Sequence, residues 1–271
     1  MENLIKKKNN FHLKHIVMAL LVSCTYFDLI AQVPYKKIVT DSVTIYRINP
    51  RQHPIRLYWK DNYNQPIGTL KKLQDYVRFT GKTLKFAMNA GISDSGIYTS
   101  GLTPKGLYIE KGVKLKEINN ETHHSDNKPV KNYFLGRKGI FYLTKEHKAY
   151  IIPSTGDLPY SSMFFATQSA PLLLMNNTIE PDILPLKKSK VPRNGIGIRA
   201  DGTLILIISN TEKIGDKYKY PVSFFDFAVL FKTQKCVAAL YLDGNISLSY
   251  DLSMNVADNH RRFGVILGIE E

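Results

Sequence analysis

Cysteine, tryptophan and acidic side chains are scarce in this chain. Its 271 residues include two cysteines and one tryptophan, and 37 lysines and arginines outnumber 23 aspartates and glutamates. Cleavage of the N-terminal segment described below leaves Cys236 as the single free thiol, which excludes an intramolecular disulfide in the mature chain. Cys236 begins an apolar strand pattern and has no histidine nearby in sequence. We therefore expect a buried structural thiol and not a nucleophile.

Several motifs that carry chemistry are also absent. The sequence has no Gly-x-Ser-x-Gly elbow, no glycine-rich phosphate loop followed by lysine, and no internal repeat. His123 and His124 precede Asp126, but adjacent histidines point apart and no spaced partner accompanies them. We predict neither a metal site nor a cofactor.

The N-terminus carries export signals and no membrane-spanning run. Four lysines precede an apolar stretch at 16–22 that is too short to cross a bilayer, so we predict a signal peptide at 1–31. Two cleavage sites stay open. Residues 21–24 resemble a lipobox that would leave a lipid anchor on Cys24, whereas residues 29–31 suit ordinary cleavage. We favour the second, because strand-like sequence begins soon after Gln32. Both predict a domain at 32–271 in the periplasm or outside the cell, with contact to a membrane only through that lipid.

The net charge of +14 favours anionic partners such as phosphorylated glycans or nucleic acid. The lysines are scattered in pairs and are not aligned along one helix with interleaved aromatic residues. A solvated basic surface is therefore the plain alternative. We do not expect nucleic acid as the partner of an exported protein.

Strand signals dominate the rest of the chain, and two helices stand out. Residues 69–80 and 222–234 have helical spacing of apolar residues, and the second begins with a capping-box pattern at Ser223 and Asp226. The pattern predicts a single α+β domain with twisted, mostly antiparallel sheets and a few packed helices. The expected strands are 43–48, 55–59, 84–88, 107–110, 140–143, 204–208 and 238–242.

Four apolar segments end in short polar side chains, which is typical of the floor of a polar pocket. The candidate residues are Asn89; Gln168 and Ser169; Arg193 and Asn194; and Asp243, Gly244 and Ser247.

Each of these segments also has a plainer interpretation. Asp243-Gly244 fits a tight hairpin turn, as Asp201-Gly202 does, although Ser247 continues the polar series after it.

Arg193 could bind a phosphate or simply be exposed where a strand begins, and the glycines that follow it indicate close approach of a ligand or another backbone. Asn89 and Gln168 could bind sugar hydroxyls or satisfy backbone groups at strand ends. Glu110, directly before a Lys-Gly turn, could be a solvated turn residue or a catalytic acid.

Taken in order, these segments resemble the phosphodiester glycosidase domain family, which includes the mannose 6-phosphate uncovering enzyme and exported bacterial proteins. The resemblance covers roughly 84–268. It rests on the segments at 88–91, 106–110, 166–169 with Pro171, 193–197, 225–228, and 240–244 with Ser247.

The resemblance implies a hydrolase that cleaves a sugar–phosphate diester on the sugar side. The substrate would be an envelope or extracellular phosphoglycan. Because a phosphomonoester leaves readily, the main needs are neutralisation of the phosphate charge, for which Arg193 is the candidate, and one carboxylate. Asp243 is the first candidate for that carboxylate and Glu110 the second. The remaining polar residues would bind sugar or phosphate oxygens: Asn89, Gln168, Ser169, Asn194, Gly244 and Ser247.

Two other functions stay open. One is a non-catalytic, exopolysaccharide-related glycan-binding protein of the envelope. The other is a phosphodiesterase that cuts on the phosphorus side, which would normally need a metal cluster.

Overall fold

The computed structural model describes residues 33–94, 102–121, 132–188, 190–210, 213–214, 217–254 and 257–271. The predicted signal peptide, with Cys24, and the segment with His123, His124 and Asp126 lie outside the described residues. Pro34–Glu271 forms one compact unit. No helix in the described part of the chain is long and apolar enough to cross a membrane.

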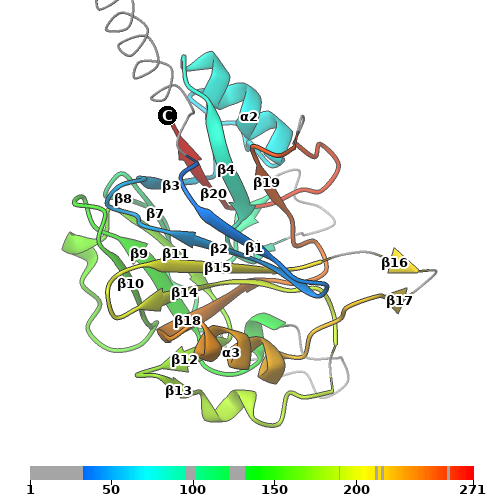
Figure 1. Ribbon diagram of the computed structural model, residues 1–271. Helices are drawn as coiled ribbons and strands as arrows, with labels where there is room; N and C mark the ends of the chain where they lie inside the picture. The colour runs from blue at the N-terminus through cyan, green and yellow to red at the C-terminus, as the bar shows by residue number, and fades with distance from the viewer. Residues whose placement is uncertain are drawn as a thin grey trace, which may run out of the picture. The chain divides into compact units, whose positions relative to one another are not determined.

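Three antiparallel sheets build this unit, as the sequence predicted. Seven strands pair in the order β1-β2-β15-β14-β18-β12-β13 (Figure 1). They are β1 (Lys36–Val39), β2 (Val43–Ile48), β15 (Leu204–Ser209), β14 (Asn194–Arg199), β18 (Cys236–Asp243), β12 (Leu172–Met175) and β13 (Thr178–Ile179).

A five-stranded sheet and a four-stranded sheet complete the architecture, with orders β10-β9-β11-β7-β8 and β19-β4-β20-β3. The five strands are β10 (Ala149–Pro153), β9 (Gly139–Leu143), β11 (Phe165–Ser169), β7 (Tyr108–Glu110) and β8 (Val113–Lys116). The four are β19 (Ser249–Asp251), β4 (Leu84–Asn89), β20 (Ile266–Glu270) and β3 (Ile55–Tyr58). Short pairs and 3-10 helices connect them: β5 (Ser93–Asp94) with β6 (Thr103–Pro104), β16 (Lys213–Ile214) with β17 (Lys217–Tyr218), η1 (Asn132–Phe134), η2 (Tyr160–Ser162) and η3 (Pro181–Ile183).

One continuous apolar core joins the three sheets. Side chains from each of them pack in it, including Tyr46 of β2, Phe86 of β4, Phe141 of β9 and Leu240 of β18. Burial of these large apolar surfaces is the main force that holds the sheets together. The arrangement matters for function because it brings the ends of β4, β14 and β18 to one place.

The first described helix, α2 (Leu70–Phe79), covers the four-stranded sheet (Figure 1). It begins where the Thr69 hydroxyl accepts a hydrogen bond from the Lys72 amide, and it ends before Gly81, whose φ of 79° favours glycine. Leu70, Leu73 and Val77 are buried, as the helical spacing predicted. Tyr76 was expected inward but is only partly buried at the edge of the helix.

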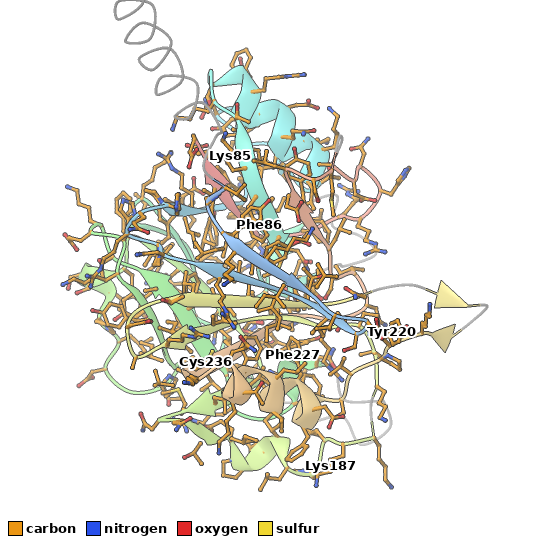
Figure 2. All side chains as sticks on the ribbon, in the orientation of Figure 1. Lys85, Phe86, Lys187, Tyr220, Phe227 and Cys236 are labelled. Carbon is orange, nitrogen blue, oxygen red and sulfur yellow. The ribbon has the colours of Figure 1, made fainter. Side chains whose placement is uncertain are left out.

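The second helix, α3 (Phe224–Thr233), packs on the seven-stranded sheet, and Figure 2 labels Phe227 on it and Cys236 at the start of β18. The Ser223 hydroxyl accepts a hydrogen bond from the Asp226 amide, so the predicted cap is confirmed. All four expected inward residues are buried: Phe224, Phe227, Ala228 and Phe231. Cys236 is buried beneath the helix, and burial raises the pKa of its thiol to about 12.

The glycines of β14 face α3 and not a ligand. A Cβ atom at Gly197 would lie 2.6 Å from Cδ1 of Phe231 and 2.7 Å from Sγ of Cys236, closer than such atoms can approach. The expected close approach is real, but an aromatic side chain and a sulfur atom make it.

Gly197→Ala should therefore lower the free energy of unfolding by about 1–3 kcal/mol, because the added methyl overpacks the space beneath α3. Urea denaturation of the purified protein measures this change. Phe231→Ala removes the whole ring, with the Cδ1 atom nearest to Gly197, so the same substitution should cost clearly less in that background. An equal cost in both backgrounds would show that contact with Phe231 is not the cause.

Candidate active site

Three polar strand ends meet where the four-stranded and seven-stranded sheets join. Asn89 is the last residue of β4, Asn194 is the first of β14, and Asp243 is the last of β18. Asn194 and Asp243 are paired across neighbouring antiparallel strands. The sheet register thus places an amide beside a carboxylate, and β4 brings the second amide from another sheet.

Asn89 is the hub of this cluster. Its Nδ2 donates to Oδ2 of Asp243 at 2.9 Å, and its Oδ1 accepts from Nδ2 of Asn194 at 2.8 Å and from the Leu248 amide at 3.0 Å. Nδ2 of Asn194 also donates to the Asn89 carbonyl at 2.7 Å. Both asparagines are fully buried, so these bonds fix which face of the Asn89 amide points at the carboxylate.

Asp243 combines partial burial with two hydrogen-bond donors. Besides Asn89, the Gly244 amide donates to its Oδ1 at 2.7 Å. Both donors favour the carboxylate, yet desolvation outweighs them and raises the pKa of Asp243 to about 6. A half-buried carboxylate that titrates near neutral pH suits a nucleophile or a general base.

The turn after Asp243 is not the hairpin that the Asp-Gly pair also suggested. That hairpin needs positive φ at both residues, and neither Asp243 nor Gly244 has it. The chain turns through residues 244–247 and enters β19 of the other sheet. Asp201-Gly202, by contrast, is the plain turn between β14 and β15, with φ of 85° at Gly202.

Ser247 stabilises this turn and is fully buried. Its hydroxyl donates to the Asp243 carbonyl at 3.3 Å, and its amide donates to the Gly244 carbonyl at 2.7 Å. Nη1 of Arg261 donates to the Ser247 carbonyl at 2.7 Å, which ties the turn to the segment before β20. In this structure Ser247 therefore supports the backbone that carries the carboxylate.

Gln168 and Ser169 lie at the end of β11 and are buried. The Gln168 side chain accepts hydrogen bonds from the amides of Leu107 and Asn119, at 3.0 and 2.8 Å, and donates to the Asn119 carbonyl at 2.9 Å. The Ser169 hydroxyl donates to the carbonyl of Leu242, the residue before Asp243, at 3.2 Å. Both side chains bond backbone groups around the cluster, which was the plainer interpretation of these residues.

Arg193 precedes Asn194 but does not face open solvent. It is fully buried: its Cζ lies 3.4 Å from the ring centre of Phe224, and its Nε donates to the Val222 carbonyl at 2.8 Å. Burial lowers the pKa of the guanidinium to about 10, so it stays charged at neutral pH. The alternative of an arginine exposed where the strand begins is wrong, because stacking on α3 encloses the side chain beside Tyr241.

Glu110 is not brought to Asp243. It lines a separate cavity of about 190 Å³ with Arg56 and Glu270, and the Tyr108 hydroxyl donates to its Oε2 at 2.7 Å. Burial raises the pKa of this carboxyl. Ile266 of β20 pairs with Asn89, and Glu270, which lines the cavity, is four residues further along the same strand, or roughly 13 Å away. Glu110 was predicted as the second catalytic carboxylate, and this separation removes it from the cluster.

No sequence signal pointed to the contacts that surround Gly244. There, Nδ2 of Asn132 in η1 donates to the Tyr241 hydroxyl at 2.9 Å, and a Cβ atom at Gly244 would lie 2.6 Å from that hydroxyl. A short 3-10 helix has no periodic pattern, so only its contacts place Asn132 here. Lys105 and Lys138 lie against the same 3-10 helix.

Two further observations concern the rest of the described surface. A depression of about 710 Å³ lies beside α2, lined in part by Tyr63, Tyr76 and Phe79, and none of its lining residues belongs to the cluster. Among the described residues, no group of three or more His, Cys, Asp or Glu side chains is arranged to hold a metal ion.

Solved structures share this fold. The catalytic domain of zebrafish N-acetylglucosamine-1-phosphodiester alpha-N-acetylglucosaminidase, auto-inhibited by its pro-peptide, aligns with a TM-score of 0.57 and 13% identity over 88% of this chain and 81% of that one. A Burkholderia pseudomallei K96243 protein named "Putative exported protein" aligns with a TM-score of 0.53 and 10% identity over 84% and 73%. At such low identity the likeness concerns the fold alone.

Sequence comparison is more specific. Uncharacterized protein YigE of Escherichia coli K12 is 31% identical over 212 residues, which are 78% of this chain and 75% of that protein. The model of the family described as "Phosphodiester glycosidase" matches residues 82–270. That match includes Asn89, Asn194, Asp243 and the strands that bring them together. The chain therefore belongs to the phosphodiester glycosidase family.

Proposed function

We propose that this protein hydrolyses glycosyl phosphodiesters on the sugar side, with Asp243 as the catalytic carboxylate. The observation that carries the proposal is the Asp243 carboxylate, oriented by Asn89 and the Gly244 amide and titrating near neutral pH. Membership of the family supports the reaction class.

The proposed reaction requires one carboxylate and little general-acid catalysis. The bond between the anomeric carbon and the phosphate oxygen breaks, and the phosphomonoester departs with the bonding electrons. Water supplies a hydroxyl group to the anomeric carbon and releases a proton. Asp243 acts either as the nucleophile that first bonds the anomeric carbon or as the base that accepts the proton from water. An ionised phosphomonoester is a good leaving group, so the absence of Glu110 from the cluster does not conflict with this scheme.

The asparagines hold the carboxylate in place. Asn89 bonds it directly, and Asn194 and the Leu248 amide fix Asn89. Pre-organised donors of this kind need not reorient during the reaction. We assign four other residues to the framework that supports the site. Ser169, Gly244 and Ser247 bond the segment around Asp243, and Gln168 bonds the backbone of Leu107 and Asn119.

We further propose that the protein is exported and acts on phosphoglycans of the envelope or the extracellular space. The basic, apolar N-terminal segment and the excess of basic residues support this assignment.

The position of bond cleavage tests the proposal. The purified protein is incubated with α-N-acetylglucosamine-1-phospho-sugars in ¹⁸O-labelled water, and the phosphomonoester is examined by ³¹P NMR. We expect free sugar and a phosphomonoester without ¹⁸O, because water attacks carbon.

Other outcomes would point elsewhere. Label in the phosphate group would identify a phosphodiesterase that cuts on the phosphorus side. Saturable binding of the intact diesters without turnover of any of them would identify the glycan-binding envelope protein. Either result would overturn the proposal.

A further inference from the structure

Two lysines lie against the same pair of aromatic rings beside the site. Nζ of Lys105 lies 5.4 Å from the ring centre of Tyr133 and 5.3 Å from that of Phe134. Nζ of Lys138 lies 5.4 and 5.7 Å from the same two centres. Two positive charges from different segments of the chain thus converge on η1.

Their contacts neutralise these charges only in part. Lys105 pairs with Asp94 at 2.8 Å, and the Asp94 side chain is 48% exposed. Lys138 donates to a backbone carbonyl, that of Glu121, at 2.6 Å, while the Glu121 carboxylate acts on it at longer range. Among the described residues, Asp94 is the carboxylate that forms an ion pair with either lysine. Partial burial, together with the nearby charge of Lys105, lowers the pKa of Lys138, which indicates a place where an anion would be favoured.

The lysines border the candidate active site through η1. Asn132, the first residue of η1, bonds the Tyr241 hydroxyl, and its Nδ2 lies 3.3 Å from where a Cβ of Gly244 would be. The Lys105 amide donates to the carbonyl of Ile92, three residues after Asn89, at 3.0 Å. Lys105 therefore belongs to a segment that adjoins the end of β4. Gly139, the residue after Lys138, pairs with Ser169, whose hydroxyl bonds the carbonyl of Leu242 just before Asp243.

Close packing fixes the backbone next to Lys105. A Cβ atom at Gly106, the residue after Lys105, would collide with the Tyr133 hydroxyl and with Oε1 of Gln168. The backbone at Lys105 is thereby fixed against η1 and β11. The Cα atom of Lys105 is therefore held in one place, whereas its long side chain can still rotate and move the ammonium group.

We propose that Lys105 and Lys138 bind the phosphate group of the substrate, the role that the sequence suggested for Arg193. This inference rests on the proposed function. A phosphodiester carries one negative charge and the departing phosphomonoester approaches two, so cations at this position stabilise the transition state more than the bound substrate. Lysine ammonium groups suit this task because they act as point charges on phosphate.

The test separates phosphate binding from turnover. Lys105→Met, Lys138→Met and the double variant keep the apolar stems and remove the charges. We expect each single variant to lower kcat/KM for a glycosyl phosphodiester about tenfold or more, and Lys138→Arg to recover most of the loss. The matched control is Lys145→Met, which removes one charge from an exposed turn between β9 and β10 and should change kcat/KM less than about twofold.

A second measurement does not depend on turnover. Calorimetric titration of inorganic phosphate into the Asp243→Asn protein should give saturable binding, and the double lysine substitution in that background should weaken it about tenfold or more. If the double lysine substitution weakens phosphate binding but the parent protein turns over no glycosyl phosphodiester, the lysine site is supported and only the proposed reaction is overturned. Unchanged phosphate affinity and unchanged kcat/KM in the double variant, with the thermal transition retained, would overturn the lysine site and leave the proposed reaction standing.

Discussion

Asp243→Asn should lower kcat/KM for a glycosyl phosphodiester by about a thousandfold or more, because asparagine can neither bond the anomeric carbon nor accept a proton from water. Its amide has nearly the shape of the carboxyl group but one acceptor oxygen in place of two, so one of the two donors, the Gly244 amide or Nδ2 of Asn89, keeps its hydrogen bond and the other loses its acceptor. The measurement is initial rates of phosphomonoester release from a glycosyl phosphodiester. A variant with more than about a tenth of the parent activity would exclude Asp243 as the catalytic carboxylate.

The pH dependence gives this prediction a second readout. Asp243 must be ionised to act, and desolvation raises its pKa to about 6. For the parent protein, kcat/KM should therefore fall as the pH drops below about 6, roughly tenfold per pH unit. A value of kcat/KM that stays constant from about pH 7 to about pH 4 would mean that ionised Asp243 is not required for the reaction.

Stability provides the control for folding. The ordinary pKa of an aspartate is 3.8, so between about pH 4 and pH 6 the folded state holds a proton that the unfolded state has lost. The parent protein thus loses stability as the pH rises through this window, and above about pH 6 it carries the full cost of an ionised, half-buried carboxylate. Asp243→Asn lacks that cost. Relative to the parent, the variant should therefore gain on the order of 1 kcal/mol of unfolding free energy or more between about pH 4 and neutral pH, whatever the loss of one hydrogen-bond acceptor costs at every pH.

Asn89→Ala is expected to have the second largest effect, a loss of about a hundredfold in kcat/KM at about pH 6.5. The substitution removes the donor to Oδ2 of Asp243, and it leaves the Leu248 amide and Nδ2 of Asn194 without the Oδ1 acceptor. Asn89 bonds the carboxylate form, so its removal should raise the pKa of Asp243 further. The acid limb of the pH profile should shift to higher pH, and part of the lost activity should return at about pH 8.

The pH shift distinguishes positioning of the carboxylate from general destabilisation. Gln168→Ala is a suitable comparison, because it also removes several buried hydrogen bonds, here to the backbone of Leu107 and Asn119. Each variant should lose about 2–4 kcal/mol of unfolding free energy. The acid limb should move in Asn89→Ala and stay in place in Gln168→Ala. An unmoved limb in Asn89→Ala would show that Asn89 does not tune Asp243.

Local sequence was sufficient for most of the secondary structure. Expected strands at 43–48 and 204–208 correspond to β2 and β15 within one residue. Both helices lie where the apolar spacing indicated, and the second begins at the predicted cap, Ser223. These features depend on neighbours a few residues apart, so the chain encodes them locally. The same holds for the turn at Asp201-Gly202.

The sequence did not predict which strands are neighbours or which strand ends are joined by hydrogen bonds. The sequence singled out Asn89, Asn194 and Asp243 as polar strand ends, but not the order in which their strands pair or the hydrogen bonds that join them. Those bonds link residues more than 100 positions apart, between strands of different sheets. No local pattern reports such contacts.

By itself, then, the sequence determined the α+β class, the positions of both helices and of several central strands, and the polar strand ends from which the site is drawn. Tertiary structure alone decided which of them act together. It enclosed Arg193 against Phe224 and placed Glu110 in a separate cavity, away from Asp243. It also placed Lys105 and Lys138 against the aromatic rings of η1. The physical reason is that burial and charge environment arise from packing between distant segments, whereas periodicity and capping arise within one.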